Sequence, residues 1–311
     1  MPVNEALHGF PKTRVNIYAE VRRMLVKKMK IIILTCYVFI QILNVQVTNA
    51  AEIVNKKIND NFYVLLGGNG QGSHVGLSIG KDYLVLIDAM MEGASSKLIK
   101  SIRNISDKPI RYVVNTHDHF DHSGGNAFFV EMGATIISHE NSQYNEPSHL
   151  LKFDNKFSLS GNTENIEVFH VDSHSSSDSI IYLKESNVIL MGDVFANEWY
   201  PALFHGGISG QIKALDLALS FSNENTVIVP GHGYITNRKG IIDYKGNSIL
   251  WVNRIMELHK NGMSLEQIVK DEKLKKIQMK FNTKNKNPAN LNKWFKELVK
   301  NTINVENGIT M

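Results

Sequence analysis

Cysteine is almost absent from this chain of 311 residues, which contains only Cys36. This residue lies in an apolar run near the N-terminus, and too little apolar sequence precedes Ile33–Cys36 for a lipidation box. A chain that begins after this run has no thiol. It needs no disulfide, and any metal site in it must consist of histidine and carboxylate side chains.

A hydrophobic run of transmembrane length is also missing near the N-terminus, because the apolar stretch Ile31–Leu43 is short for a membrane-spanning helix and contains Gln41. Lys27, Lys28 and Lys30 precede this stretch, and Thr48-Asn49-Ala50 places small residues at positions −3 and −1 of a cut after Ala50. This order is typical of a secretory signal peptide. We expect residues 1–50 to be a cleaved leader and the protein to be exported, periplasmic or secreted. An uncleaved leader, the alternative, would be its one link to a membrane, and Met24 or Met29 could be the true start.

The excess of positive charge is confined to this leader. Residues 1–50 carry seven Lys/Arg and two Glu, which leaves 27 basic and 28 acidic residues for the rest of the chain. The basic isoelectric point therefore predicts no nucleic-acid partner. Nine lysines in Lys273–Lys300 are typical of a solvated helical face, with Trp294-Phe295 as a small apolar anchor. We expect a small molecule as the partner, and the sequence does not predict an oligomeric state.

From residue 61 onward, short apolar runs alternate with segments of helical spacing, which predicts a mixed α/β domain over residues 51–311. The expected strands are Phe62–Leu66, Val75–Ile79, Tyr83–Ile87, Arg111–Asn115, Thr135–Ser138, Ile166–Val171, Ser179–Leu183, Val188–Leu190 and Thr226–Val229. The expected helices are Ser95–Ile105, Asn126–Met132, Gln211–Ser220 and a C-terminal helical extension from about residue 241. In that extension Ser264 is a good N-cap before Leu265–Val269. Residues 141–160 are polar and irregular, which predicts a loop.

Residues 115–122, N-T-H-D-H-F-D-H, directly follow an expected strand and precede Gly124-Gly125. Strand alternation sends His117 and His119 to the same side, whereas Asp121 and His122 can face a second point nearby. One ion bound by the first pair and another by the second would explain this spacing. An accidental, solvent-facing cluster is the alternative.

Three further candidate ligands follow other expected strands. His174 comes after Ile166–Val171, Asp193 follows Gly192 at the end of an apolar strand, and His232 lies within Pro230–Gly233. Glycine beside the last two allows the backbone to approach a crowded centre. Three imidazoles per site suit zinc with one position left for water, which is the arrangement of a catalytic ion.

H-x-H-x-D-H, a distant histidine, G-D and P-G-H-G in this order resemble the metallo-β-lactamase superfamily of hydrolases, over about residues 58–236. The resemblance implies an α/β fold, a four-layer αββα sandwich with metals in a groove along one edge of its two sheets. It implies that the first metal is held by His117, His119 and His174, that the second is held by Asp121, His122 and His232, and that Asp193 bridges both. His170 is the rival of His174, which is favoured because Ser175 and Asp178-Ser179 follow it as in the family pattern. Asp88 resembles a carboxylate that orients a ligand imidazole through its other nitrogen; a surface turn carboxylate is the alternative.

The resemblance further implies a dinuclear, metal-dependent hydrolase with two Zn²⁺, although manganese or iron would also suit these ligands. A metal-bridging hydroxide would attack an ester, thioester, lactone or lactam, with Asp121 orienting it and passing a proton. A true class B-like β-lactamase is one alternative, but the bridging position there usually carries Cys or Ser rather than Asp193. An iron-dependent persulfide dioxygenase-like oxidoreductase is another. A non-catalytic binding module is disfavoured, because all seven ligands are present.

Other residues are candidates for the rim of the site. The Gly-rich stretch Gly67–Ser73 resembles a mobile flap, and His74 is either a substrate contact or, as we favour, a partly buried turn histidine. Trp199, Tyr200 and His205 follow Asp193 closely enough to border the groove, or they serve packing alone.

Overall fold

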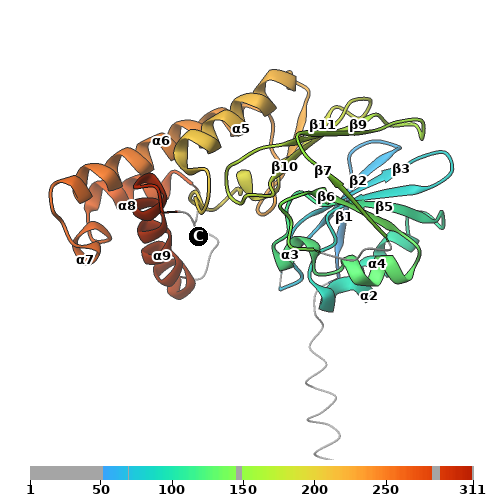
Figure 1. Ribbon diagram of the computed structural model, residues 1–311, viewed down its shortest axis with the longest axis horizontal. Helices are drawn as coiled ribbons and strands as arrows, with labels where there is room; N and C mark the ends of the chain where they lie inside the picture. The colour runs from blue at the N-terminus through green and yellow to red at the C-terminus, as the bar shows by residue number, and fades with distance from the viewer. Residues whose placement is uncertain (1–51, 69, 145–148, 282–287, 310–311) are drawn as a thin grey trace, which may run out of the picture. The chain divides into compact units, whose positions relative to one another are not determined.

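The computed structural model describes residues 52–309, except residues 69, 145–148 and 282–287 (Figure 1). The expected leader, residues 1–50, lies outside the described residues. Ile53–Met311 cluster as one unit of the fold. Across the described part of the chain, no helix combines the length and the apolar character needed to span a bilayer.

Two β-sheets form the centre of this unit. The first sheet has the strand order β1-β2-β3-β4-β5-β6-β7, in which β1 to β4 are antiparallel neighbours and β4 to β7 are parallel. Its strands are β1 (Val54–Lys57), β2 (Phe62–Leu66), β3 (Val75–Ile79), β4 (Leu84–Ile87), β5 (Ile110–Val114), β6 (Thr135–His139) and β7 (Leu150–Phe153). The second sheet has the order β12-β11-β10-β9-β8, with only β11 and β12 parallel. Its strands are β8 (Lys156–Leu159), β9 (Ile166–His170), β10 (Ser179–Leu183), β11 (Val188–Leu190) and β12 (Val227–Val229).

Helices cover the outer faces of both sheets, so the fold has the expected four αββα layers (Figure 1). The first sheet is accompanied by η1 (Glu92–Ala94), α2 (Ser95–Arg103), α3 (Phe120–Ser123) and α4 (Asn126–Glu131). The second is followed by η3 (Gly192–Val194), α5 (Gly207–Phe221), α6 (Arg238–Lys260), α7 (Leu265–Ile268), α8 (Glu272–Met279) and α9 (Pro288–Glu306).

Three apolar clusters separate these layers. Between the sheets, Phe62 and Ile87 of the first sheet share a buried cluster with Ile181 and Leu190 of the second. A second cluster packs the other face of the first sheet against Leu98 and Ile102 of α2. These two residues are four apart, so they share one face of the helix. The alternation of side chains in strands such as β2 thus places buried apolar residues on both faces of the first sheet.

The third cluster joins the second sheet to the C-terminal helices. Trp251 of α6 is fully buried, stacks on Tyr200 at an interplanar angle of 7°, and donates an indole hydrogen bond to Thr302 of α9. Phe295 of α9 contacts both rings edge-on. The expected helix start at Ser264 is confirmed, because its side chain and that of Gln267 form a reciprocal capping box. The C-terminal helices therefore share the core of the second sheet.

The prediction of a loop over residues 141–160 was wrong for part of this segment, which contains β7 and β8. Both strands have four residues, lie at sheet edges and leave most side chains partly or fully exposed. Edge strands often carry lysine, here Lys152 and Lys156, which keeps another chain from pairing with them and obscures the apolar pattern. The fully exposed edge strand β1 was missed for the same reason.

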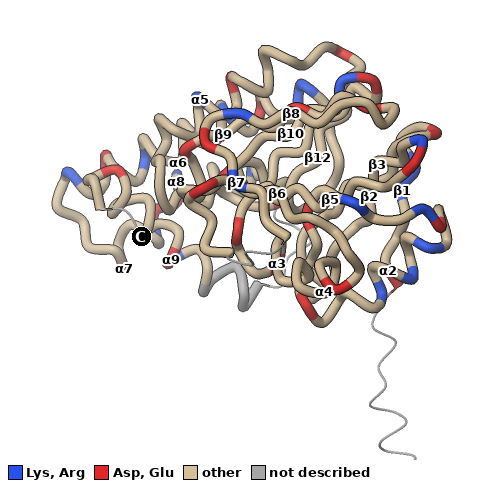
Figure 2. The backbone as a smooth tube through the Cα atoms, turned by 45° about the vertical axis from the view of Figure 1, so that its right-hand side comes forward, with Lys and Arg blue, Asp and Glu red and all other residues tan. Residues whose placement is uncertain are grey.

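Charged residues of both signs are interspersed along the described chain. Figure 2 shows the Lys and Arg segments intermixed with Asp and Glu segments rather than gathered into one continuous stripe. Several of these charges pair locally, as Lys245 does with Asp216 and Arg254 with Asp271.

Candidate metal centre

Four strands end at the same edge of the two sheets, and each is followed by a segment that carries candidate ligands. β5 leads into residues 115–122, where His119 is the N-cap of α3. In the second sheet, β9 and β11 each pair antiparallel with β10, and β12 is parallel to β11, so the three run in one direction. Their carboxyl ends lead to His174, Asp193 and His232 respectively. The topology therefore brings distant parts of the chain to one edge.

The seven side chains named from the sequence converge there in three overlapping groups. These groups are His117-His119-His174, His117-His122-Asp193 and Asp121-His122-His232, and the possible ligand atoms of each lie within 4.8 Å of one another. His174 Nε2 is 3.0 Å from His119 Nδ1. His232 Nε2 is 3.1 Å from Asp121 Oδ2.

The two oxygens of Asp193 face different parts of this cluster. Oδ1 is 3.4 Å from His122 Nε2 and 3.5 Å from His232 Nε2, whereas Oδ2 is 3.8 Å from His174 Nε2. One carboxylate thus lies between the His119–His174 side and the His122–His232 side of the cluster.

Three buried polar atoms in the cluster lack a hydrogen-bond partner among the described residues: His117 Nε2, His122 Nε2 and Asp193 Oδ1. Each buried, unsatisfied polar atom costs about 1–3 kcal/mol of stability. All three belong to one of the groups above. This donor set of imidazole nitrogens and a carboxylate oxygen fits a cation that accepts nitrogen and oxygen ligands.

The protonation preferences of the histidines agree with this fit. Burial, together with the neighbouring imidazoles, holds the pKa of His117 well below its ordinary value. Burial also lowers the pKa of His174 to about 4. Burial acts in the same direction on His122, but the carboxylates of Asp193 and Asp88 outweigh it and raise the pKa of His122 well above its ordinary value. The neutral rings of His117 and His174 have the form that binds metal. The two carboxylates beside His122 favour a positive charge there, which either a proton or a cation can supply.

Asp88 orients His122 from the side away from the cluster. Its buried carboxylate accepts hydrogen bonds from the Thr116 backbone N–H and hydroxyl, both at 2.8 Å, and lies 2.9 Å from His122 Nδ1. A proton on Nδ1 donates to Asp88 and leaves Nε2 free to face Asp193. His174 is oriented in the same way by the carbonyl oxygen of Ala202, 2.8 Å from its Nδ1.

A tight turn sets the direction of His174. The carboxylate of Asp178 accepts hydrogen bonds from the Ser175 backbone N–H at 2.8 Å and from its hydroxyl at 2.6 Å. The rival histidine, His170, lies elsewhere. It stacks on His139 with a centroid distance of 3.6 Å and belongs to none of the three groups. The structure thus brings His174, and not His170, to the cluster.

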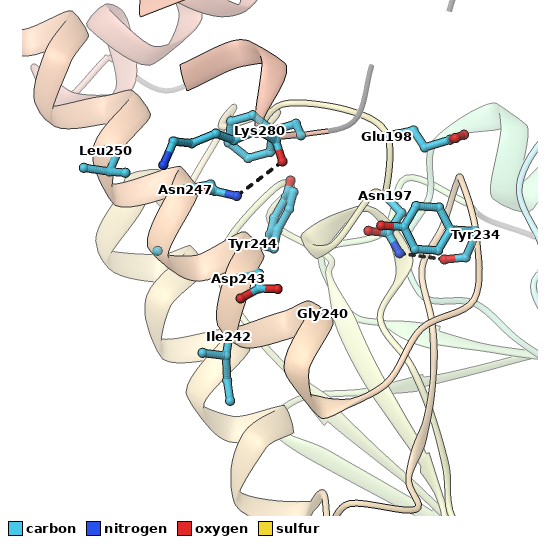
Figure 3. A pocket seen from close by; sticks show the side chains of 12 residues that line it. Asn197, Glu198, Tyr234, Gly240, Ile242, Asp243, Tyr244, Asn247, Leu250 and Lys280 are labelled. Carbon is cyan, nitrogen blue, oxygen red and sulfur yellow. Dashed lines mark hydrogen bonds between the residues drawn. The ribbon is translucent and has the colours of Figure 1, made fainter. Parts of the chain in front are cut away.

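The loops that carry Asp193 and His232 are bonded to each other. The Gly231 N–H donates to the Gly192 carbonyl at 2.8 Å, and the Asn197 N–H donates to the His232 carbonyl at 2.9 Å. A Cβ at Gly231 would collide with Asp193 Oδ1, so this position requires glycine. Figure 3 shows the side-chain amide of Asn197 directed at the Tyr234 carbonyl oxygen, to which it donates at 2.6 Å.

The cavity in Figure 3, of about 490 Å³, is separate from the cluster. It lies along α6 and is lined by residues such as Asn197, Tyr234 and Tyr244, but by none of the seven side chains.

A cavity of about 550 Å³ opens over the cluster itself. Its lining comprises His119, Phe120, Asp121, His174, Asp193, Ala196, Trp199, Ala202, Phe204, His232, Trp294 and Leu298. A neighbouring cavity of about 580 Å³ shares its His119, Phe120, His174 and Phe204. Phe120, Phe204 and the two α9 residues were not predicted from the sequence as lining residues. For Phe120 the position inside the histidine motif was an available signal, whereas nothing local indicates Trp294.

The other rim candidates divide between the cavities and the core. Trp199 lines the cavity over the cluster, and His205, paired with Asp172, lines the neighbouring one. Tyr200 is fully buried in the core.

His74 is a buried structural residue. Its Nδ1 accepts from the Gly67 N–H at 3.0 Å, its Nε2 is 2.6 Å from the Gly233 carbonyl oxygen, and burial lowers its pKa to about 4. Both ring nitrogens are therefore engaged by the backbone, as favoured for a turn histidine.

The chain is similar to known proteins in sequence and in fold. The family model described as "Metallo-beta-lactamase superfamily" matches residues 68–232. A probable hydroxyacylglutathione hydrolase of Schizosaccharomyces pombe is 32% identical over 139 residues, which are 44% of this chain and 53% of the relative. A hydroxyacylglutathione hydrolase of Pelagibacter ubique is 28% identical over 137 residues, 43% of this chain and 56% of the relative. The chain thus spans about half the length of the curated relatives it matches.

Solved structures share the fold. A sec-alkylsulfatase from Pseudomonas sp. superposes with a TM-score of 0.57 at 17% identity, covering 70% of this chain and 45% of the sulfatase. A metallo-β-lactamase from Pontibacter korlensis gives 0.54 at 18% identity, covering 62% of this chain and 97% of that enzyme. At these identities the likeness concerns the fold.

Proposed function

The chain belongs to the metallo-β-lactamase superfamily, and we propose that it is a metal-dependent hydrolase that cleaves an ester, thioester, lactone or lactam bond at two metal ions. The observation that carries this proposal is the position of Asp193, whose two oxygens face the two sides of a cluster of candidate ligand atoms. A mononuclear or purely structural site would not need a carboxylate between two sets of imidazoles.

In this proposal His117, His119 and His174 would hold the first cation, and Asp121, His122 and His232 would hold the second. Asp193 would contribute to both sites. Zinc suits this set of imidazoles and carboxylates, and manganese or iron would also bind it. When bound, such cations supply Lewis acidity that lowers the pKa of a shared water molecule and polarises the bond to be cleaved.

The protein's own residues would orient the reactants. Asp121 lines the cavity and remains a carboxylate, because the hydrogen bond to His232 and the charge of His122 lower its pKa even though burial acts to raise it. It can hold the attacking water and accept its proton. The water oxygen then bonds to the acyl carbon, the bond to the leaving oxygen, sulfur or nitrogen breaks, and a proton passes to the leaving atom.

Ester and thioester bonds are the preferred substrates in this proposal. Two relatives have names that describe thioester hydrolysis. The carboxylate at position 193 supports the same choice, since class B β-lactamases usually have Cys or Ser at the bridging position. β-Lactam hydrolysis and oxygen chemistry are therefore outcomes of the test rather than the expectation.

The test is hydrolysis by purified protein beginning at residue 51. Its metal content is measured, and the substrates are a lactone, a thioester, a phosphodiester and a cephalosporin. His119→Ala should abolish any activity found, whereas His170→Ala should keep it. His170→Ala is a matched control, because His170 is also a histidine at the end of a strand but lies outside the cluster. Oxygen consumption without hydrolysis would overturn the proposal.

We also propose that the protein acts outside the cytoplasm. This proposal depends on the sequence of residues 27–50 alone, in which basic residues, an apolar run and small residues follow one another.

A further inference from the structure

We infer that the substrate of this site is an uncharged ester or thioester with a bulky apolar acyl group, and that Trp294 of α9 is a specificity-determining residue that contacts this group. The inference depends on the proposed hydrolase function and adds the chemical class of its substrate.

The wall of the cavity over the cluster is apolar apart from the proposed ligands. Five of the lining residues are proposed ligands, and every other described residue in the lining is apolar: Phe120, Ala196, Trp199, Ala202, Phe204, Trp294 and Leu298. A bound group that fills this space gains free energy by leaving water only if it is itself apolar. The wall therefore fits an alkyl chain or an aromatic ring beside the scissile bond.

Two aromatic residues in the lining of this cavity are exposed to solvent. The relative exposure of Phe120 is 69% and that of Trp294 is 46%, although both line a cavity. Two large aromatic side chains that remain exposed beside the same cavity offer an apolar surface that a ligand can cover. His119, Asp121 and their partners lie in the same lining, so a group held against these rings would place its carbonyl near the cluster.

The wall formed by α9 is fixed in position. Leu298, one helical turn after Trp294, lines the cavity and is almost fully buried, and Phe295 and Val299 belong to the core cluster of the second sheet. Trp294 is thus presented by a helix that cannot shift without disturbing this core. It lies outside the part of the chain that the family model matches, residues 68–232. The C-terminal extension therefore contributes to substrate choice.

The leaving group has a different environment. The neighbouring cavity shares Phe120 and Phe204 with the first but is otherwise lined mainly by polar residues, including Asn141, Gln143 and Ser176. Among the described residues that line either cavity, none is lysine or arginine. An uncharged polar leaving group fits this arm. Glutathione carries two carboxylates, and the described lining offers no lysine or arginine to pair with them.

The experiment measures how the length of the acyl chain affects hydrolysis by the metal-loaded protein that begins at residue 51. Its substrates are p-nitrophenyl esters of two-, four- and eight-carbon acids, with S-lactoylglutathione as the anionic thioester. If the cavity encloses the acyl chain, kcat/KM should rise by about fourfold for each added methylene group until the cavity is filled, since each buried CH₂ contributes about 0.8 kcal/mol. The octanoyl ester should exceed S-lactoylglutathione by at least about tenfold.

Variants of α9 test the assigned residue. Trp294→Ala should lower kcat/KM for the octanoyl ester by about tenfold through KM and leave the acetyl ester within about twofold. Trp294→Phe should recover most of the loss, because it restores an aromatic wall. Met279→Ala is the matched control. Met279 is an exposed apolar residue of α8 that lines neither cavity over the cluster. Its replacement should leave kcat/KM unchanged for both the acetyl and the octanoyl ester.

The outcomes separate the two proposals. If no ester, thioester, lactone or lactam is hydrolysed, the proposed function fails. If hydrolysis occurs but kcat/KM is flat with chain length, or S-lactoylglutathione is the better substrate, the inference on substrate class is overturned while the hydrolase proposal stands. An equal loss for acetyl and octanoyl esters in Trp294→Ala would overturn the role of this residue.

Discussion

The contact between Asp88 and His122 provides a sharp test, because it controls one ring nitrogen of a proposed ligand without contributing a ligand atom. We predict that Asp88→Asn weakens metal binding while the protein remains folded. Asparagine has nearly the same size, and it tolerates the left-handed backbone of position 88, where φ is 65°. Its carbonyl oxygen can still accept the Thr116 N–H, as one carboxylate oxygen now does at 2.8 Å.

The weakening follows from hydrogen-bond donors and acceptors. An amide NH₂ directed at His122 Nδ1 donates to it, which favours a proton on Nε2, the nitrogen that faces Asp193. An Nε2 that carries a proton cannot bind a cation. Loss of such an orienting partner typically lowers metal affinity 10- to 100-fold, which corresponds to about 1.4–2.7 kcal/mol.

Competition with a chelator of known zinc affinity measures this change, and circular dichroism checks the fold. Glu164→Gln is the matched control, because Glu164 is also a buried carboxylate that accepts hydrogen bonds from backbone N–H groups and a hydroxyl, those of Glu185 and Ser186. It should leave zinc affinity unchanged. Equal zinc affinities for Asp88→Asn and the unaltered protein, or an equal loss in the control, would refute the reasoning.

Three further predictions concern other parts of the molecule. The pKa of His74 in the folded protein, about 4, lies below the ordinary value of 6.5, so its contribution to stability is complete above pH 6.5 and is lost as the pH falls through 4. In urea unfolding, His74→Asn should remove about 3 kcal/mol of this pH dependence of the unfolding free energy. An unchanged pH dependence would contradict the prediction. Gly231→Ala should lower the melting temperature and impair zinc binding, because its Cβ would displace Asp193. Calorimetry measures the melting temperature and a zinc titration measures the binding. Gly246→Ala is the control, because a Cβ at Gly246 meets open space on the surface of α6. N-terminal sequencing of the protein from the extracytoplasmic fraction should begin at Ala51; a full-length protein retained in the cytoplasm would refute export.

Local patterns predicted the centre of the fold but not its edges. The apolar runs of β2, β3 and β10 were predicted with the bounds that the structure has, because these strands are mostly buried and their composition is strand-like. β1, β7 and β8 lie at or beside sheet edges, where exposed polar side chains remove the signal.

The convergence of the candidate ligands was predictable because each follows a strand, and strands that run in one direction end at one edge. The choice of His174 over His170 also had a local basis, since Ser175 and Asp178 form the turn that the sequence pattern implied. Trp294 and Phe204 could not be placed, because their position in the cavity wall depends on how helices pack over a distance of many residues.

Anomalous diffraction at the zinc absorption edge, from crystals of the zinc-loaded protein, shows whether Asp193 lies between two cations. We expect two anomalous peaks, one beside His117, His119 and His174 and the other beside Asp121, His122 and His232, with one oxygen of Asp193 toward each. A single peak, or peaks away from these side chains, would contradict it.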